Sequence, residues 1–153
     1  MIRLFLDKKL ILGSENDHVM RDFRKLAVWK KAHEQYLFVK RSIASKFPPS
    51  ERFELSSQLQ RASLSVVLNI VEGCGRASDR DFAHFLDTAL GSANEVDYCC
   101  FAGLELNYIS ENDYNAIYAL INETRAMLIS FIRFLRKHNN PQPSSFNPQP
   151  SIT

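Results

Sequence analysis

The stretch that decides the fold is QLQRASLSVVLNIVEGCGR, residues 58–76. On a helix at about 100° per residue, one narrow stripe is polar and nearly all the remaining surface is apolar or small. A helix with so little surface suited to water is expected to be buried on several sides. The polar stripe is formed by residues spaced three or four apart, namely Gln58, Arg61, Ser65, Asn69 and Glu72.

Two interpretations of the stripe are open. It could be a row that contacts a ligand or RNA, or a polar seam in which the side chains bond to neighbouring helices or subunits. An ionised Arg61 or Glu72 in an apolar core would lose on the order of several kcal/mol unless it were paired. Because the residue types complement one another as donors and acceptors, we favour the seam. Arg76, just beyond it, is expected to cap or bridge the turn that follows.

The whole chain predicts four helices, and the stretch above belongs to the second of them. The first is expected over about 24–46, because apolar residues share one arc and Phe47-Pro48-Pro49 ends the helical pattern. The second begins at Ser50 or Glu51 and closes at Gly73 and Gly75. The third opens at Ser78 and ends near Leu106. The fourth starts at Ser110, with Asp113 completing a capping box, and ends in cations near 137.

Small residues interrupt the third helix at its middle. Gly91, Ser92 and Ala93 follow one another there. A glycine inside a helix costs about 1 kcal/mol relative to alanine. We therefore expect another backbone to approach the helix closely at this point.

Composition and charge limit the class of protein. The 153 residues suit one domain, and no apolar run approaches the roughly 20 residues of a membrane helix. The three cysteines, Cys74, Cys99 and Cys100, have no metal-type spacing, so reduced thiols in the cytoplasm are the simplest account. Residues 21–46 hold eight basic and two acidic side chains, whereas residues 47–110 hold four and nine. This asymmetry suits complementary packing between subunits or a local polyanion site.

No catalytic or cofactor site is predicted. Asp81 and His84 form one carboxylate-x-x-His pair, but a di-iron bundle needs two such motifs and two further glutamates. The EGCGR loop lacks the preceding strand and the Gly-Lys-Ser/Thr of a phosphate-binding loop. Trp29 lies on an apolar arc, where a tryptophan is more often core than a base-stacking platform. We expect no metal, no cofactor, no small-molecule substrate and no enzymatic activity.

The motifs also resemble a known family. Gln58-x-x-Arg61-Ala62, Ser65, Asn69-Ile70-x-Glu72-Gly73, Gly75-Arg76 and Gly91-Ser92-x-x-Glu95 are similar to the bacterial four-helix-bundle proteins named for intervening sequences in 23S ribosomal RNA. The opening residues Phe23, Leu26, Val28 and Trp29 also match that family, and the likeness spans about 21–137. The resemblance implies an antiparallel up-down bundle assembling as a ring-shaped homopentamer, without an established reaction. It adds Ser92 and Glu95 to the expected seam.

These observations predict an all-α protein with an N-terminal extension over 1–20, a four-helix bundle over 21–138 and a Pro/Ser/Asn-rich tail over 139–153. The first functional hypothesis is a non-enzymatic oligomeric scaffold or adaptor that binds another macromolecule. The alternative is an RNA-binding protein linked to ribosomal RNA or to reverse-transcriptase partners through the basic first helix. In that alternative, the candidate nucleic-acid contacts are Lys30, Lys31 and Arg41.

Overall fold

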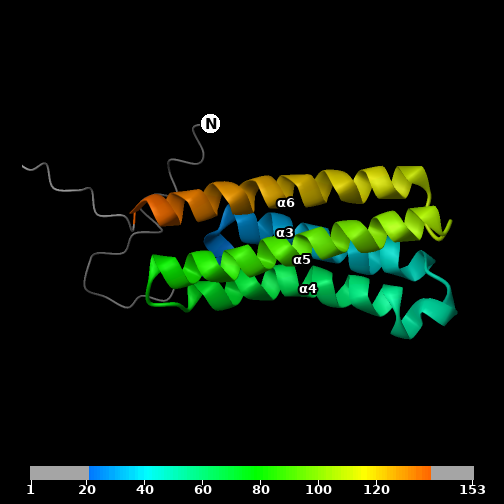
Figure 1. The fold of residues 1–153 in the computed structure, drawn as a ribbon, viewed down its shortest axis with the longest axis horizontal. Helices are drawn as coiled ribbons and strands as arrows, with labels where there is room; N and C mark the ends of the chain where they lie inside the picture. Colours follow the sequence, from blue (N-terminus) through cyan, green and yellow to red (C-terminus); the bar gives the residue numbers. More distant parts are fainter. Residues whose placement is uncertain (1–20, 139–153) are drawn as a thin grey trace, which may run out of the picture.

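A computed structural model describes residues 21–138, so the proposed extension over 1–20 and tail over 139–153 lie outside the described residues. The described part folds into four long helical segments and contains no strand (Figure 1). The predicted all-α class and the four helices are therefore confirmed for this part of the chain.

The first segment is less regular than the single helix expected over 24–46. A 3₁₀ turn, η1 (Phe23–Lys25), is capped by Asp22 and is followed by Leu26 in an extended conformation. The α-helix α3 then spans Ala27–Phe38 and continues as a π-helical turn, η2 (Val39–Ile43), and a 3₁₀ turn, η3 (Ala44–Lys46). The predicted end at Lys46 is correct, but the prediction of one continuous helix was wrong at the start, where Leu26 interrupts it, and in the type of its last turns.

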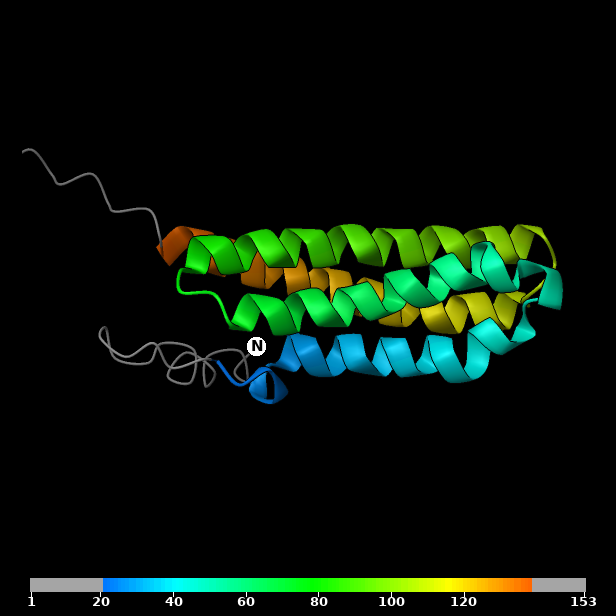
Figure 2. The same cartoon turned by 90° about the horizontal axis from the view of Figure 1, so that it is seen from below.

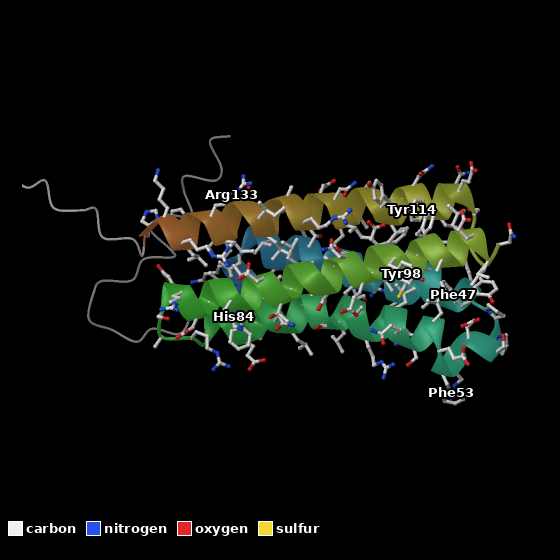
Figure 3. The ribbon with its side chains drawn as sticks, viewed as in Figure 1. Phe47, Phe53, His84, Tyr98, Tyr114 and Arg133 are labelled. Atoms are coloured by element: carbon white, nitrogen blue, oxygen red, sulfur yellow. The ribbon has the colours of Figure 1, made fainter. Side chains whose placement is uncertain are left out.

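The second segment begins later than predicted. Residues Pro49–Phe53 form a separate 3₁₀ turn, η4, and Glu54 breaks the helical conformation with φ −115° and ψ −113°. Helix α4 spans Leu55–Cys74. Phe53 projects away from the bundle and is 81% exposed (Figure 3), because the turn directs it outward before the helix starts.

Of the two glycines predicted to close α4, Gly75 does so as the C-cap, whereas Gly73 does not. Gly73 lies inside the helix and is buried. A Cβ added to Gly73 would lie 2.5 Å from Cδ2 of Phe82, so this glycine allows α5 to approach closely. Gly75 caps the helix with φ −82°, a conformation open to other residues.

The third and fourth helices follow their capping signals. Helix α5 spans Asp79–Glu105, with Ser78 accepting from the backbone N–H of Asp81, and α6 spans Glu111–His138. The predicted box at the start of α6 is present: Asp113 N donates to Ser110 Oγ at 3.1 Å, and Ser110 N donates to Asp113 Oδ2 at 3.1 Å. Both capping predictions are confirmed.

Asn107 makes the turn between α5 and α6. It has φ 59°, a left-handed conformation that asparagine tolerates better than most residues. Asn107 N donates to the carbonyl of Leu104 and Tyr108 N to that of Gly103. This pair of bonds is a Schellman motif, which satisfies the last carbonyls of α5.

In the bundle, α5 packs beside both α4 and α6, and α3 completes the far side between α4 and α6 (Figures 1 and 2). The core is mostly apolar. Its largest fully buried apolar side chains come from all four helical segments: Ile43, Leu59, Ile70, Phe82, Leu86, Ile117, Ile121, Leu128 and Leu135.

Candidate functional site

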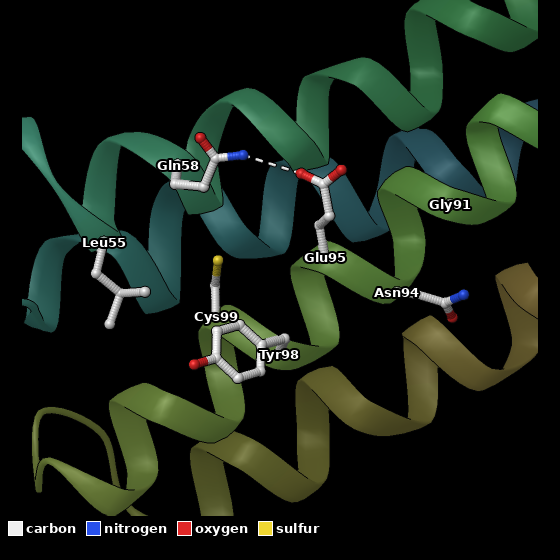
Figure 4. Close-up of a pocket in the computed structure, with 7 residues that line it drawn as sticks. All are labelled: Leu55, Gln58, Gly91, Asn94, Glu95, Tyr98 and Cys99. Atoms are coloured by element: carbon white, nitrogen blue, oxygen red, sulfur yellow. Dashed lines mark hydrogen bonds between the residues drawn. The ribbon is translucent and has the colours of Figure 1, made fainter.

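The predicted polar stripe lies along the boundary between α4 and α5. At one end, Gln58 Nε2 donates to Glu95 Oε2 at 2.9 Å, and Arg61 donates to Gln58 Oε1 at 3.2 Å. The amide therefore links a cation on α4 to a carboxylate on α5 (Figure 4).

In its middle, the stripe is a chain of hydroxyl and amide groups. The Ser65 and Ser92 hydroxyl oxygens lie 2.8 Å apart, and Asn69 Nδ2 donates to both the carbonyl and the hydroxyl oxygen of Ser65. The Ser92 hydroxyl also donates to the Thr88 carbonyl at 3.1 Å. Four of the eight predicted seam residues thus bond across α4 and α5 within one chain, and Arg61 and Asn69 bond to two of these four from within α4.

At the other end, the stripe reaches solvent. Arg76 pairs with Glu72 at 2.7 Å, and its guanidinium lies 4.4 Å from the centre of the Phe85 ring. Arg61, Glu72 and Arg76 are all exposed in the single chain. The desolvation argument for a buried Arg61 therefore does not apply within one chain, where Gln58 is its only hydrogen-bond partner among residues 21–138.

Beside the seam, large apolar side chains face outward. Leu64 and Leu68 on α4 are 38% and 52% exposed, and Tyr98 and Phe101 on α5 are also exposed. A shallow groove at this boundary is lined by Leu55, Gln58, Gly91, Asn94, Glu95, Tyr98 and Cys99 (Figure 4). Exposed apolar area of this kind marks interaction surfaces.

The family model described as 23S rRNA-intervening sequence protein matches residues 24–130. The chain belongs to that family. A crystal structure of a protein of unknown function from the S23 ribosomal protein family of Bacteroides thetaiotaomicron is similar, with 28% identity and a TM-score of 0.64 over 69% of this chain and 95% of the other. A comparison with curated proteins found no match.

The candidate nucleic-acid contacts of this family member differ in availability. Lys31 Nζ bonds to Glu34 at 2.8 Å and to Glu123 at 2.9 Å. These two carboxylates raise the pKa of Lys31. Because the Lys31 ammonium is already paired with them, it is less available to bind a phosphate. Lys30 and Arg41 are exposed and have no ion pair within residues 21–138.

Trp29 is not an open stacking platform. Its ring stacks on His33, with centroids 5.0 Å apart and planes 8° apart, and it packs against Phe23 at 4.9 Å. The half-buried indole therefore already has aromatic neighbours on its own helical segment, which leaves little ring surface for a base.

The groups that could carry metal or redox chemistry are dispersed or shielded. In the described part of this family member, no three His, Cys, Asp or Glu side chains are arranged to hold a metal ion. Burial raises the pKa of Cys74 and Cys99 to about 11 and that of Cys100 to about 12. Such thiols stay protonated near neutral pH and react slowly. Among the described residues, no helix is long and apolar enough to cross a membrane.

Gln35 was not singled out from the sequence. This α3 residue is fully buried, and neither its amide nitrogen nor its amide oxygen has a hydrogen-bond partner within residues 21–138. The Ser63 hydroxyl on α4 is also buried without a partner there. Gln35 lies on the same face of α3 as the buried apolar residues. Helical periodicity could therefore have identified it in the sequence as a buried polar residue.

Proposed function

We propose that this chain is the non-enzymatic subunit of a ring-shaped homo-oligomer, an up-down bundle that serves as a scaffold or adaptor for another macromolecule. The observation that carries the proposal is the outward-facing pair Leu64 and Leu68 on α4, which residues 21–138 leave exposed. A lone bundle needs one apolar stripe per helix, so further outward leucines support a contact with another chain.

The family supports five subunits in the ring, and a closed ring would leave no contact surface open for filament growth. The free thiols of Cys74, Cys99 and Cys100 support a cytoplasmic location for the assembly. Light scattering coupled to size exclusion, with native mass spectrometry for the subunit number, tests the assembly at micromolar concentration. We expect a single species of five chains. A monomer would overturn the proposal.

RNA is the second candidate ligand. The observation that favours it is a pair of exposed cations, Lys30 on α3 and Arg41 on η2, which have no ion pair within residues 21–138. The family description, 23S rRNA-intervening sequence protein, names a ribosomal RNA element and so supplies the probe. Helix α3 lies behind α5 in Figure 1, away from the seam and its exposed groove. Lys30 on α3 and Arg41 on the turn that continues it would therefore stay accessible if α4 and α5 contacted other subunits.

Fluorescence anisotropy with a labelled fragment of 23S ribosomal RNA tests this candidate. We expect binding that weakens steeply with salt, because phosphate contacts release counterions. The double variant Lys30→Glu/Arg41→Glu should weaken it by about tenfold or more. The charge-matched control Arg133→Glu/Lys137→Glu, on the exposed end of α6, should keep most of the affinity for the RNA fragment. Absence of RNA binding at low salt, or an equal loss of affinity in both variants, would overturn RNA recognition by Lys30 and Arg41.

A further inference from the structure

The exposed residues of α4 and α5 occupy matching heights along the bundle. The bonds Gln58–Glu95 and Ser65–Ser92 show that residue numbers rise along α4 as they fall along α5. Leu64 precedes Ser65 by one residue and Gly91 precedes Ser92 by one. These two residues therefore lie within about 3 Å of the same height, since a helix rises about 1.5 Å per residue.

The chemistry at these heights is complementary. On α4, the outward residues in order are Arg61, Leu64, Leu68 and Glu72. At corresponding heights, α5 presents Glu95, Gly91, Thr88 and His84. A cation thus stands level with a carboxylate, two leucines stand level with a glycine and a threonine, and a carboxylate stands level with a histidine.

Gly91 has no structural explanation inside the chain. It lies in the middle of the 27-residue helix α5 and is exposed, and a Cβ added to it would meet nothing within 4 Å. Alanine would therefore fit there and would favour the helix by about 1 kcal/mol. The close backbone approach that the sequence predicts at this position is not made by any residue of 21–138. An approach from another molecule accounts for the glycine.

We infer that the α4 strip of one copy docks on the α5 strip of the next copy, with Arg61 facing the neighbour's Glu95 and Leu64 facing the neighbour's Gly91. This inference rests on the proposed ring. When copies are related by an axis parallel to the bundle, each residue keeps its height, so residues at equal heights meet across the contact. Charge complementarity then fixes the register, and the glycine admits the leucine.

The two strips lie on neighbouring helices and not on opposite sides of the bundle (Figure 2). A head-to-tail contact between neighbouring edges turns each copy relative to the last, and this turn closes a small ring. The same contact explains why Arg61 and Glu95 each have only the Gln58 amide as a partner within residues 21–138. In the assembly, each also has an opposite charge on the adjacent copy.

A charge swap tests the contact by light scattering over a range of protein concentrations. Arg61→Glu places two carboxylates face to face, and Glu95→Arg places two cations face to face. Each single variant should raise the concentration at half-assembly by about tenfold or more. The double variant Arg61→Glu/Glu95→Arg recreates one opposite pair per contact and should restore the wild-type size. The matched control Arg41→Glu, on η2, should assemble normally.

Leu64→Gln keeps the test decisive if a charge variant folds poorly. The Leu64 side chain is exposed in the single chain. The variant monomer should therefore keep its helical circular dichroism and its cooperative unfolding, while assembly is lost. Wild-type protein that is monomeric would overturn the proposed assembly itself. Wild-type protein that assembles, with no effect of Leu64→Gln or with no rescue by the double charge variant, would overturn only the assigned contact.

Discussion

The hydroxyl oxygens of Ser65 on α4 and Ser92 on α5 lie 2.8 Å apart, at the centre of the boundary between the two helices. Ser92 is buried, and Ser65 is half-buried and also accepts from Asn69. This small polar contact joins two otherwise largely apolar surfaces. It marks one point of the register in which α4 and α5 pack, from which the heights of the exposed residues on both helices can be compared.

The Ser65–Ser92 contact should be measurable by a double-mutant cycle. Ser65→Ala and Ser92→Ala should each lower the free energy of unfolding by about 1 kcal/mol, because each removes one side of a hydrogen bond. The double variant should cost less than the sum of the singles, with a coupling on the order of 0.5–1.5 kcal/mol. Urea unfolding measures all four proteins. Strictly additive effects would show that the two hydroxyls do not interact.

Gly73→Ala should destabilise the protein by about 1–3 kcal/mol through overpacking. The new methyl would lie 2.5 Å and 2.8 Å from two carbons of the fully buried Phe82 ring and 3.1 Å from Cβ of Phe85, so these neighbours would have to shift. Gly75→Ala is the matched control, because its nearest contact would be 3.4 Å from the Glu72 carbonyl oxygen. Thermal unfolding should separate the two variants; equal melting temperatures would contradict the packing role of Gly73.

Gln35→Met should raise the free energy of unfolding by about 1–2 kcal/mol. The glutamine amide is fully buried without a hydrogen-bond partner in the described chain, and methionine has nearly the same shape without the polar groups. Gln60→Met serves as the control, because the Gln60 side chain accepts from Lys40 and that bond would be lost. Destabilisation by Gln35→Met in chemical denaturation would indicate that the amide is satisfied in solution.

Asp113 should contribute a pH-dependent part of the stability. The Lys46 ammonium, followed by the Ser110 hydroxyl, holds the pKa of Asp113 below its ordinary value. The ionised carboxylate is therefore stabilised in the folded state. Its contribution is present above the ordinary pKa of about 3.9 and is lost as the pH falls through the lower folded value.

Unfolding curves between pH 2 and pH 7 test this with Asp113→Asn. The stability difference from the wild type should be largest near neutrality and should shrink below about pH 4. Glu111→Gln, an exposed carboxylate in the same first turn of α6, controls for the charge at the helix N-terminus. A difference in the free energy of unfolding between Asp113→Asn and the wild type that stays constant across this pH range would contradict a pH-dependent contribution of Asp113.

The local signals that proved correct depend on neighbours in the chain. Ser78 and Ser110 cap α5 and α6 because the acceptor and the orphaned N–H groups lie within one helical turn of each other. Period and capping together also predicted the four helices and the helix that carries each seam residue. The signals that failed lie at the ends of α3 and α4. At the start of each helix, a 3₁₀ turn (η1 or η4) replaces the predicted helical turn, because Leu26 and Glu54 adopt conformations that side-chain periodicity does not encode.

The amino-acid sequence by itself determined the all-α class, the polar stripe of α4 and the capping of α5 and α6, because each arises from contacts within a few residues. Only the tertiary structure decided which groups the stripe meets. It pairs Ser65 with Ser92 across 27 positions, leaves Arg61 exposed and pairs Lys31 with Glu123. It also leaves open space beside Gly91, where an added Cβ would meet nothing within 4 Å among residues 21–138. These outcomes depend on the relative position of whole helices, which the packing of the shared core sets and no single segment specifies.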